Sequence, residues 1–221
     1  MALPPELIGR LGRHSTPTIC NAIEEFAVRN RSAGFMSPAV RCIYPRLPPL
    51  VGYAVTATIR ASRPPAGGPS RHAFWDAVLA VPAPRVVVMQ DLDPEPVGAY
   101  WGEVQANIHR ALGCVGVVTS GGVRDVDEVA ALGFHFFAAC LLPSHAYVHL
   151  VDIGGPVTVG GLEVCSGDLL HGDQHGVTSI PLEIAAGIDE AVERQAERER
   201  RILTACRAEP FSLGELRRAV S

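Results

Sequence analysis

The sequence predicts an α/β layered domain built on a mixed β-sheet. Strand-like and helix-like segments alternate through the middle of the chain, over residues 51–142. A run of short hairpin strands follows over 157–180, and a long charged helical stretch comes after it. Alternating strands and helices are typical of a parallel sheet covered by helices, and the later hairpins would add antiparallel strands to that sheet.

Apolar periodicity and turn residues predict the elements of the first half of the chain. They are a helix over 15–26 with Ser15 or Thr16 as its N-cap, a loop or short strands over 30–50, a strand over 51–59, a loop over 63–70, a helix over 73–80 and a strand over 85–90. The strand over 51–59 places its larger apolar residues at every second position, which predicts that they share one face.

The second half begins with a helix over 101–113. Its expected buried stripe is Trp101, Val104, Ile108, Ala111 and Leu112, with Gly113 as the stop. The later predicted elements are a buried strand and glycine turn over 113–123, a helix capped by Asp125 and ending at Gly133, a strand over 134–142, a loop or short strand over 143–155, a Gly-Gly hairpin over 157–164, two short strands around a turn at 173–176, a helix over 183–207, and a short helix opened by the Ser212–Glu215 capping box.

Length and composition predict one domain. The 221 residues show no internal repeat and no long linker, so we expect a single unit over 1–221, with a core of about 15–181 and a C-terminal helical segment of 183–221. The net charge of −4 gives no basic footprint for nucleic acid. No apolar run is long enough for a membrane span and no signal-peptide layout is present, so we expect a cytoplasmic protein without membrane contact.

The chain contains no lysine, since all 19 basic residues are arginine. This excludes a Schiff-base lysine and a Walker-type phosphate loop, which needs Gly-Lys. The six cysteines are scattered without a Cys-x-x-Cys pair, so they predict neither a disulfide framework nor a zinc site. Carbonyl chemistry in this chain would therefore use a metal ion or hydrogen bonds.

The strongest candidate site follows the strand that begins at Gly113. A glycine turn delivers Arg124 and Asp125 side by side where a helix is predicted to begin. Glycines let a backbone approach a ligand closely, and helix amides favour an anion. The alternative is that Asp125 is only an N-cap and Arg124 its exposed neighbour.

A second helix start competes for the same role. Gly102 precedes a predicted helix whose first free N–H groups belong to Glu103, Val104 and Gln105, which is a carboxylate-binding arrangement. The two helix starts are separated by one helix and one strand. In a βαβ-like unit they can face one pocket at the carboxyl end of the strands.

Histidines offer another site. His171, Asp173 and His175 would share one face if they lay on one strand, and two imidazoles with a carboxylate are the ligand set of a non-haem iron site. A turn through Gly172 and Asp173–Gly176 would spoil that face. His145 and His149 are predicted to be loop or interface residues, although their loop could shape substrate choice.

The residues resemble the RraA-like family, which includes 4-hydroxy-4-methyl-2-oxoglutarate (HMG) aldolases and the regulator of ribonuclease E activity. The strongest pieces are Tyr100–Glu103, the Gly113–Asp125 stretch, and the later Gly167-Asp-Leu-Leu and Asp173-x-x-Gly-Val. The family pattern is an acid, 20 intervening residues, then Arg-Asp, and here Glu103 precedes Arg124-Asp125 at that spacing. The characterised aldolases carry aspartate where this chain has glutamate.

The resemblance implies an α-β-β-α sandwich of the swivelling β/β/α type, assembled as a homotrimer or hexamer with sites between subunits. It implies that Asp125 binds Mg²⁺ or Mn²⁺ directly and Glu103 through a water. Arg124 would hold the keto oxygen of a small 2-keto acid, while the amides of Val104 and Gln105, after Gly102, hold its carboxylate.

The implied activity is that of a metal-dependent (class II) aldolase. Such a lyase cleaves a 4-hydroxy-2-keto acid to pyruvate, decarboxylates oxaloacetate, or both, through a metal-stabilised enolate. A neighbouring subunit would add an acid from near the C-terminal helix, with Glu183, Glu190 and Glu193 as candidates. The alternative from another class is a non-catalytic protein-binding regulator of the ribonuclease E inhibitor type.

Overall fold

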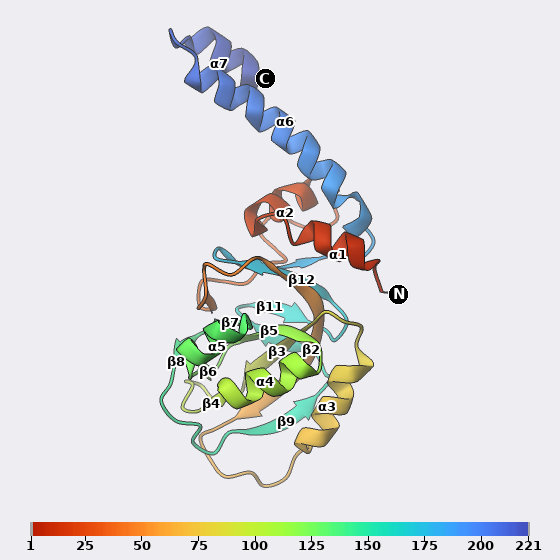
Figure 1. The fold of residues 1–221 in the computed structure, drawn as a ribbon, viewed down its shortest axis with the longest axis vertical. Coiled ribbons are helices and arrows are strands. Elements are labelled where there is room, and N and C mark those ends of the chain that lie inside the picture. Colours follow the sequence, from red (N-terminus) through yellow and green to blue (C-terminus); the bar gives the residue numbers. More distant parts are fainter. Residues whose placement is uncertain (1, 221) are drawn as a thin grey trace.

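The computed structural model describes residues 2–220 and shows the mixed α/β fold that the sequence predicts (Figure 1). Met1 and Ser221, the ends of the expected domain, lie outside the described residues. The helices are α1 (Pro5–Leu11), α2 (Thr16–Glu24), α3 (Arg71–Ala80), α4 (Glu103–Ala111), α5 (Val126–Leu132), the 3-10 helix η1 (Ala185–Gly187), α6 (Ile188–Arg207) and α7 (Leu213–Val220). The strands are β1 (Arg41–Cys42), β2 (Leu50–Arg60), β3 (Arg85–Asp91), β4 (Ala99–Trp101), β5 (Cys114–Thr119), β6 (Gly122–Val123), β7 (His135–Ala138), β8 (Cys140–Leu141), β9 (His149–Ile153), β10 (Val157–Val159), β11 (Leu162–Val164), β12 (Leu169–Asp173) and β13 (Gly176–Ile180).

A mixed sheet organises the fold. Within residues 2–220 it has eight strands, in the order β1-β7-β5-β3-β2-β12-β13 with β9 also paired to β2. The central strands β2, β3, β5 and β7 run parallel. Strand β1 pairs antiparallel with β7, strands β9 and β12 pair antiparallel with β2, and β13 pairs antiparallel with β12. Because α3, α4 and α5 connect successive parallel strands, their amino ends face the edge where those strands end.

Each face of the sheet has its own apolar core. Helices α3, α4 and α5 cover one face, where Phe74 and Val129 pack against β2, β3 and β5 (Figure 1). The hairpin β10–β11 covers the other face, with Val157 and Val159 against β3. The long strand β2 is buried along almost its whole length because it has neighbours on both faces.

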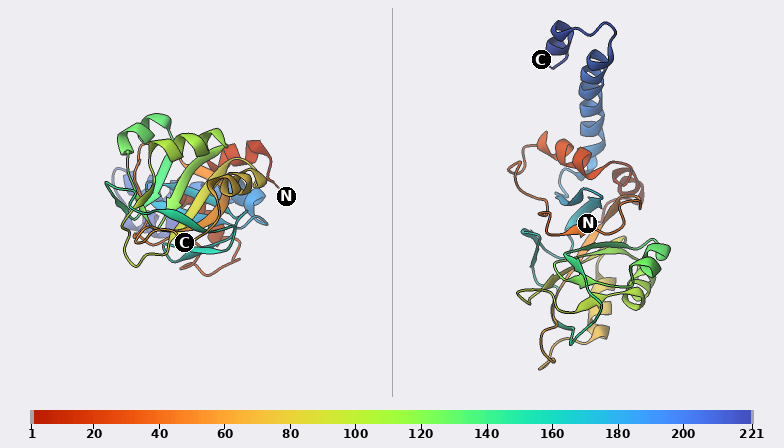
Figure 2. Two further views of the ribbon diagram at one scale, coloured as in Figure 1. Left: turned by 90° about the horizontal axis from the view of Figure 1, so that it is seen from below. Right: turned by 90° about the vertical axis from the view of Figure 1, so that its left-hand side faces the viewer.

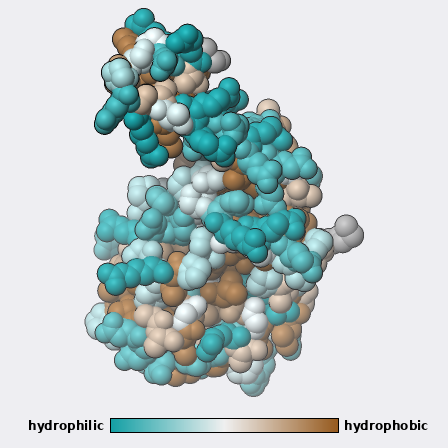
Figure 3. Space-filling model, turned by 45° about the horizontal axis from the view of Figure 1, so that its top comes forward, coloured by the Kyte–Doolittle hydropathy of each residue, from teal (hydrophilic) through white to brown (hydrophobic). Residues whose placement is uncertain are grey.

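The third core lies where α1, α2 and the first turn of α6 pack around β12, β13 and the start of β2. Beyond that core α6 extends away from the sheet, and α7 folds back along it (Figure 2). The surface of α6 and α7 beyond the core is mostly hydrophilic, with apolar side chains among the hydrophilic ones (Figure 3). Within residues 2–220, no helix combines the length and apolar content needed to cross a bilayer.

The helix predicted from Trp101 begins two residues later and buries a different face. Trp101 belongs to β4, which pairs with β6, and its indole Nε1 lies 3.3 Å from the sulfur of Met89. Helix α4 buries Gln105, Ala106 and His109, while Val104 is 67% exposed. The predicted apolar stripe was wrong for Val104 and Ala111, which are exposed. His109 can be buried in their place because one ring nitrogen lies 2.8 Å from the carbonyl of Gln105 and its ring contacts that of Trp101 at a tilt.

Two further boundaries differ from the prediction. The strand expected over 134–142 breaks at Ala139, whose N–H donates to the carbonyl of Gly121, so that β7 stays in the main sheet while β8 pairs with β6. The helix expected from residue 183 begins at Ile188, after the η1 turn. Ser212 caps α7 as predicted, accepting the N–H of Glu215 at 3.4 Å.

Candidate active site

A small parallel sheet brings the two predicted helix starts together. In the sheet β4-β6-β8, Trp101 pairs with Val123, and the N–H of Arg124 donates to the carbonyl of Trp101 at 3.0 Å. Helix α4 begins just after β4, and α5 begins just after β6. Residues about 20 positions apart in the sequence therefore become neighbours at one edge of the sheet.

Asp125 occupies the N-cap position of α5 but does not cap it. Its backbone is left-handed, with φ 53° and ψ 47°, and its side chain makes no capping hydrogen bond to its own helix. Instead, Oδ2 accepts the backbone N–H of Glu103 at 3.0 Å, at the start of α4. The predicted capping role of Asp125 was therefore wrong. A left-handed conformation in a residue other than glycine carries strain, and such strain concentrates at functional sites.

Gly102 makes room for this contact. A Cβ atom at this position would lie 2.3 Å from Oδ2 of Asp125 and 3.2 Å from Nε of Arg124. The backbone of Gly102 is extended, with φ −160°, so conformational freedom is not the reason for glycine here. The requirement is steric, because any larger residue would displace the carboxylate.

Arg124 and Asp125 form a half-exposed pair. Nε of Arg124 lies 3.7 Å from Oδ2 of Asp125, and their side chains are 38% and 34% exposed. This separation is a loose ion pair that leaves the guanidinium able to reach another oxygen. Both residues line a cleft of about 410 Å³.

Most of the predicted site residues meet in that cleft. Its lining includes these predicted residues: Gly102, Val104, Gln105, Arg124 and Asp125. The first helical bond of α4 is donated by Ala106 to the carbonyl of Gly102. The amides of Val104 and Gln105 precede that bond, so α4 itself offers them no acceptor. The amide of Glu103, predicted to be free as well, is taken by Asp125.

Sequence reasoning missed several other cleft residues. They come from the loop before α3, the first residue of α3 and β4: Pro65, Arg71, Ala99 and Tyr100. The cleft also includes His145, Ala146, Tyr147 and Val148, which belong to the loop that was expected to shape substrate choice. In the sequence, Tyr100 stands out only as part of the Tyr100–Glu103 motif shared with the RraA-like family. The influence of the 143–155 loop on substrate choice stays a prediction, and His145 from this loop is part of the cleft lining.

Polar atoms at the cleft are left without partners among residues 2–220. The hydroxyl of Tyr100 and Oε1 of Gln105 are buried and have no hydrogen bond. Burial raises the pKa of Tyr100 to about 12, against a smaller lowering by Arg71, so the phenol stays a neutral donor near neutral pH. Buried polar atoms without partners are uncommon, and in a cleft they fit contact with a ligand.

The donor set fits a divalent ion with oxygen ligands. Within the described residues, Oδ1 of Asp125 and the carboxylate of Glu103 accept no hydrogen bond. No group of three or more His, Cys, Asp and Glu side chains that could hold a metal occurs among residues 2–220. Mg²⁺ commonly keeps several waters and uses one or two carboxylates together with its substrate, so the Oδ1 of Asp125 and the Glu103 carboxylate suit it as oxygen ligands.

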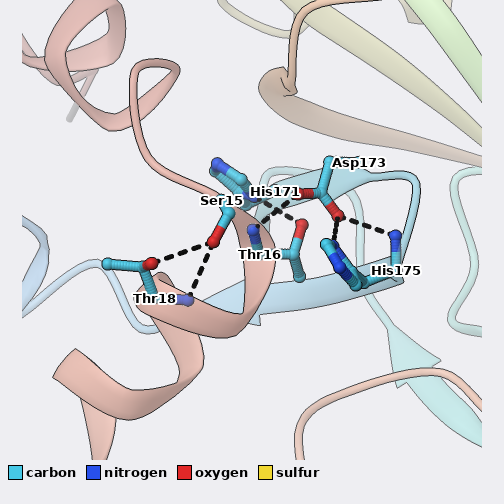
Figure 4. A network of polar contacts seen from close by, with 6 residues as sticks. All are labelled: Ser15, Thr16, Thr18, His171, Asp173 and His175. Atoms are coloured by element: carbon cyan, nitrogen blue, oxygen red, sulfur yellow. Dashed lines mark hydrogen bonds and ion pairs between the residues drawn. The ribbon is translucent and has the colours of Figure 1, made fainter. Parts of the chain in front are cut away.

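The prediction of an iron site at His171, Asp173 and His175 was wrong, because among residues 2–220 no such group could hold a metal. These side chains form a network that holds the start of α2 (Figure 4). Nδ1 of His171 lies 3.0 Å from the hydroxyl of Thr16, and Nε2 lies 3.2 Å from the carbonyl of Leu11. Asp173 accepts the N–H of Thr16 at 2.9 Å and that of His175 at 2.8 Å. Burial lowers the pKa of His171 to about 4, which keeps the ring neutral.

The remaining predicted residues lie elsewhere. His149 is on β9 and its Nδ1 lies 2.8 Å from the carbonyl of Tyr147, outside the cleft lining. Glu190 and Glu193 line a separate hollow with Arg10, Arg13 and His14. Glu183 borders another hollow, beside β12 and β13. Their expected role toward a neighbouring subunit stays a prediction.

Comparisons with known proteins place the fold and the family. The model of the RraA-like family, described as Aldolase/RraA, matches residues 16–178. A protein of Halalkalibacterium halodurans named "Putative 4-hydroxy-4-methyl-2-oxoglutarate aldolase" is 30% identical over 100 residues, which are 45% of this chain and 48% of that one. An uncharacterized protein of Methanocaldococcus jannaschii is 35% identical over 105 residues, 47% and 50% of the two chains. The matches thus span about half the length of these curated relatives.

Solved structures share the architecture. An uncharacterized protein from Pseudomonas syringae pv. tomato superposes with a TM-score of 0.75 at 21% identity, covering 99% of this chain and 94% of that one. Streptomyces coelicolor RraAS2, described as an unusual member of the RNase ES inhibitor RraA protein family, has a TM-score of 0.70 at 23% identity, covering 90% and 96%. Because the family model covers well over half of the sequence, this chain belongs to the RraA-like family.

Proposed function

We propose that this chain is a divalent-metal-dependent lyase that cleaves a 4-hydroxy-2-keto acid resembling HMG to pyruvate, decarboxylates oxaloacetate, or both. One observation carries the proposal. The contact between the Glu103 backbone N–H and Asp125 places the Asp125 carboxylate, Arg124 and the first-turn amides of α4 at one cleft. Glu103, whose side chain is not part of the cleft lining, stands directly before those amides in the sequence. That combination offers anionic ligands for a cation beside cationic and N–H donors for a keto acid.

Each group has a part in binding. Asp125 and Glu103 would hold Mg²⁺ or Mn²⁺, Asp125 directly and Glu103 through a water. The amides of Val104 and Gln105 would bind the 2-carboxylate, since helix N-termini favour anions. The guanidinium of Arg124 would donate to the keto oxygen. The ion, when bound, would supply electrostatic stabilisation to the oxygens of the keto acid.

The chain's own residues then account for bond cleavage. Glu103, whose carboxylate has no hydrogen bond or ion pair among residues 2–220, would take the proton from the C4 hydroxyl, directly or through a water. As C4 becomes a carbonyl, the electron pair of the C3–C4 bond moves toward C3 and the keto oxygen. Arg124 would stabilise the negative charge that collects on this oxygen. Protonation at C3 releases pyruvate, and loss of CO₂ from oxaloacetate reaches the same enolate.

The proposal includes its setting. The substrate would be a small 2-keto acid rather than nucleic acid, and we expect a cytoplasmic homotrimer or hexamer in which a neighbouring subunit completes the site. These expectations rest on the composition of the chain and on family membership. Analytical ultracentrifugation would measure the assembly.

The test is pyruvate release from HMG and from oxaloacetate with Mn²⁺ or Mg²⁺, repeated with EDTA. We expect release that depends on the metal and stops with the chelator. A chain that releases no pyruvate from any 2-keto acid, with either metal, is not a lyase of this kind. A non-catalytic regulator of the ribonuclease E inhibitor type would give that result and would instead inhibit the ribonuclease.

A further inference from the structure

Two side chains at the cleft have no role in the steps above. Arg71, the first residue of α3, and Tyr100, in the middle of β4, both line the cleft that holds Arg124 and Asp125. They come from elements that are not part of the Arg-Asp turn. Their position suits a second polar group on the ligand, separate from the one that Arg124 would bind.

Arg71 is a cation without a counter-ion. It is exposed, and no carboxylate among residues 2–220 lies within ion-pair distance of it. Among the residues that the structure describes, Asp125 is the only acidic side chain that lines this cleft, and Arg124 already approaches it at 3.7 Å. The cleft therefore carries two guanidiniums against one carboxylate, which fits a ligand with more than one negative charge.

Tyr100 provides the second, independent observation. The residue is only 7% exposed, and its hydroxyl has no hydrogen-bond partner among residues 2–220. Arg71 is close enough to act electrostatically on this phenol. A buried hydroxyl without a hydrogen-bond partner destabilises the fold unless a ligand provides that partner. An anionic oxygen between the phenol of Tyr100 and the guanidinium of Arg71 would accept hydrogen bonds from both groups.

We infer that Arg71 and Tyr100 bind a second carboxylate at the far end of the substrate, so that the site selects 2-keto dicarboxylates over 2-keto monocarboxylates. The inference rests on the proposed function for the position of the 2-keto acid end, which Arg124 and the α4 amides hold. Arg71 donates charge-assisted hydrogen bonds to the distal carboxylate, and Tyr100 donates its O–H. Acids that end in a methyl group leave both donors unpaired.

A matched pair of unreactive ligands tests this directly. 2-Oxoglutarate and 2-oxopentanoate have the same carbon chain and differ in a terminal carboxylate against a methyl group, and neither has the C4 hydroxyl needed for cleavage. Their dissociation constants would be measured by calorimetry with Mn²⁺ for the wild type, Arg71→Gln, Tyr100→Phe and Arg110→Gln. Arg110, an exposed arginine near the end of α4 and outside the cleft, is the control.

We expect the wild type to bind 2-oxoglutarate at least about tenfold more tightly than 2-oxopentanoate. Arg71→Gln removes most of that preference and Tyr100→Phe a few-fold of it, while Arg110→Gln leaves it unchanged. Equal binding of the two acids by the wild type, or equal weakening of both by Arg71→Gln, overturns the inference.

The outcome separates this inference from the proposed function. A dicarboxylate preference that depends on Arg71, in a chain that releases no pyruvate, supports the distal site and contradicts the lyase. Metal-dependent cleavage of HMG, with no preference between the two unreactive acids, supports the lyase and contradicts the distal site.

Discussion

The backbone N–H of Glu103 donates to Oδ2 of Asp125 at 3.0 Å, so the aspartate of one helix start binds the first amide of another. The contact fixes the Asp125 carboxylate in the lining of the cleft and leaves Oδ1 without a donor among residues 2–220. The same contact directs the Asp125 side chain away from its own helix, α5. The backbone of Asp125 is left-handed in this arrangement.

Replacing Asp125 separates its carboxylate charge from its hydrogen bond. Asp125→Asn keeps an acceptor for the Glu103 amide and tolerates the left-handed backbone, so we expect a change in unfolding free energy within about 1 kcal/mol. Mn²⁺ affinity should fall roughly 100-fold, because a direct ligand is lost. Asp125→Ala should lose the same affinity and also about 1–2 kcal/mol of stability. Calorimetry with Mn²⁺ and urea unfolding measure both quantities, and unchanged Mn²⁺ affinity in the asparagine variant would show that Asp125 is only a structural residue.

Gly102→Ala should displace the carboxylate without unfolding the chain. The new Cβ would lie 2.3 Å from Oδ2 of Asp125, while the extended backbone accepts alanine. We expect Mn²⁺ affinity and pyruvate release to fall by about tenfold or more, by analogy with the loss of a group that orients a metal ligand. Gly9→Ala is the control, because its Cβ meets nothing within 4 Å. Equal activity of the two variants would contradict the packing argument.

Acid should destabilise the fold through its buried histidines. Burial lowers the pKa of His109 and of His171 from 6.5 to about 4. Above pH 6.5 both rings are neutral in the folded and unfolded states, so they add no pH dependence. Between 6.5 and about 4 the unfolded chain binds protons that the folded chain does not, and stability falls by about 1.4 kcal/mol per pH unit for each histidine.

Urea unfolding at several pH values between 8 and 4.5 checks this slope. His109→Gln removes one of the buried rings whose pKa is lowered and should reduce the slope by about 1.4 kcal/mol per pH unit. This comparison does not depend on how far the variant lowers stability at pH 8. A free energy of unfolding that stays constant between pH 6.5 and 5 would contradict neutral buried rings.

Much of the fold could be predicted because local patterns and packing agree. The alternation in β2 and the Gly160-Gly161 turn specify their elements from sequence alone. The single helix and strand that separate Gly102 from Arg124-Asp125 likewise predicted that the two helix starts can face one cleft. In each case the chemistry depends on residues that are neighbours along the chain or on one βαβ unit.

The parts that could not be predicted depend on contacts between distant segments. Asp125 followed by Val126 and Asp127 has the pattern of an N-cap, and only the arrival of the Glu103 amide draws its side chain elsewhere. His109 has a polar side chain, yet α4 buries it against the ring of Trp101, in a tilted contact with the ring centroids 4.6 Å apart. No pattern in the sequence predicts that the Tyr100 hydroxyl is buried without a hydrogen-bond partner among residues 2–220.

Arg124 provides the most direct test of the central claim, that this cleft stabilises a developing enolate. Pyruvate release from HMG would be measured with Mn²⁺ for Arg124→Gln and for Arg110→Gln, an exposed arginine outside the cleft. We expect Arg124→Gln to lower kcat about 100- to 1000-fold, as loss of an oxyanion donor does, with Mn²⁺ affinity kept and Arg110→Gln unchanged. Wild-type rates of metal-dependent pyruvate release in Arg124→Gln would contradict the account.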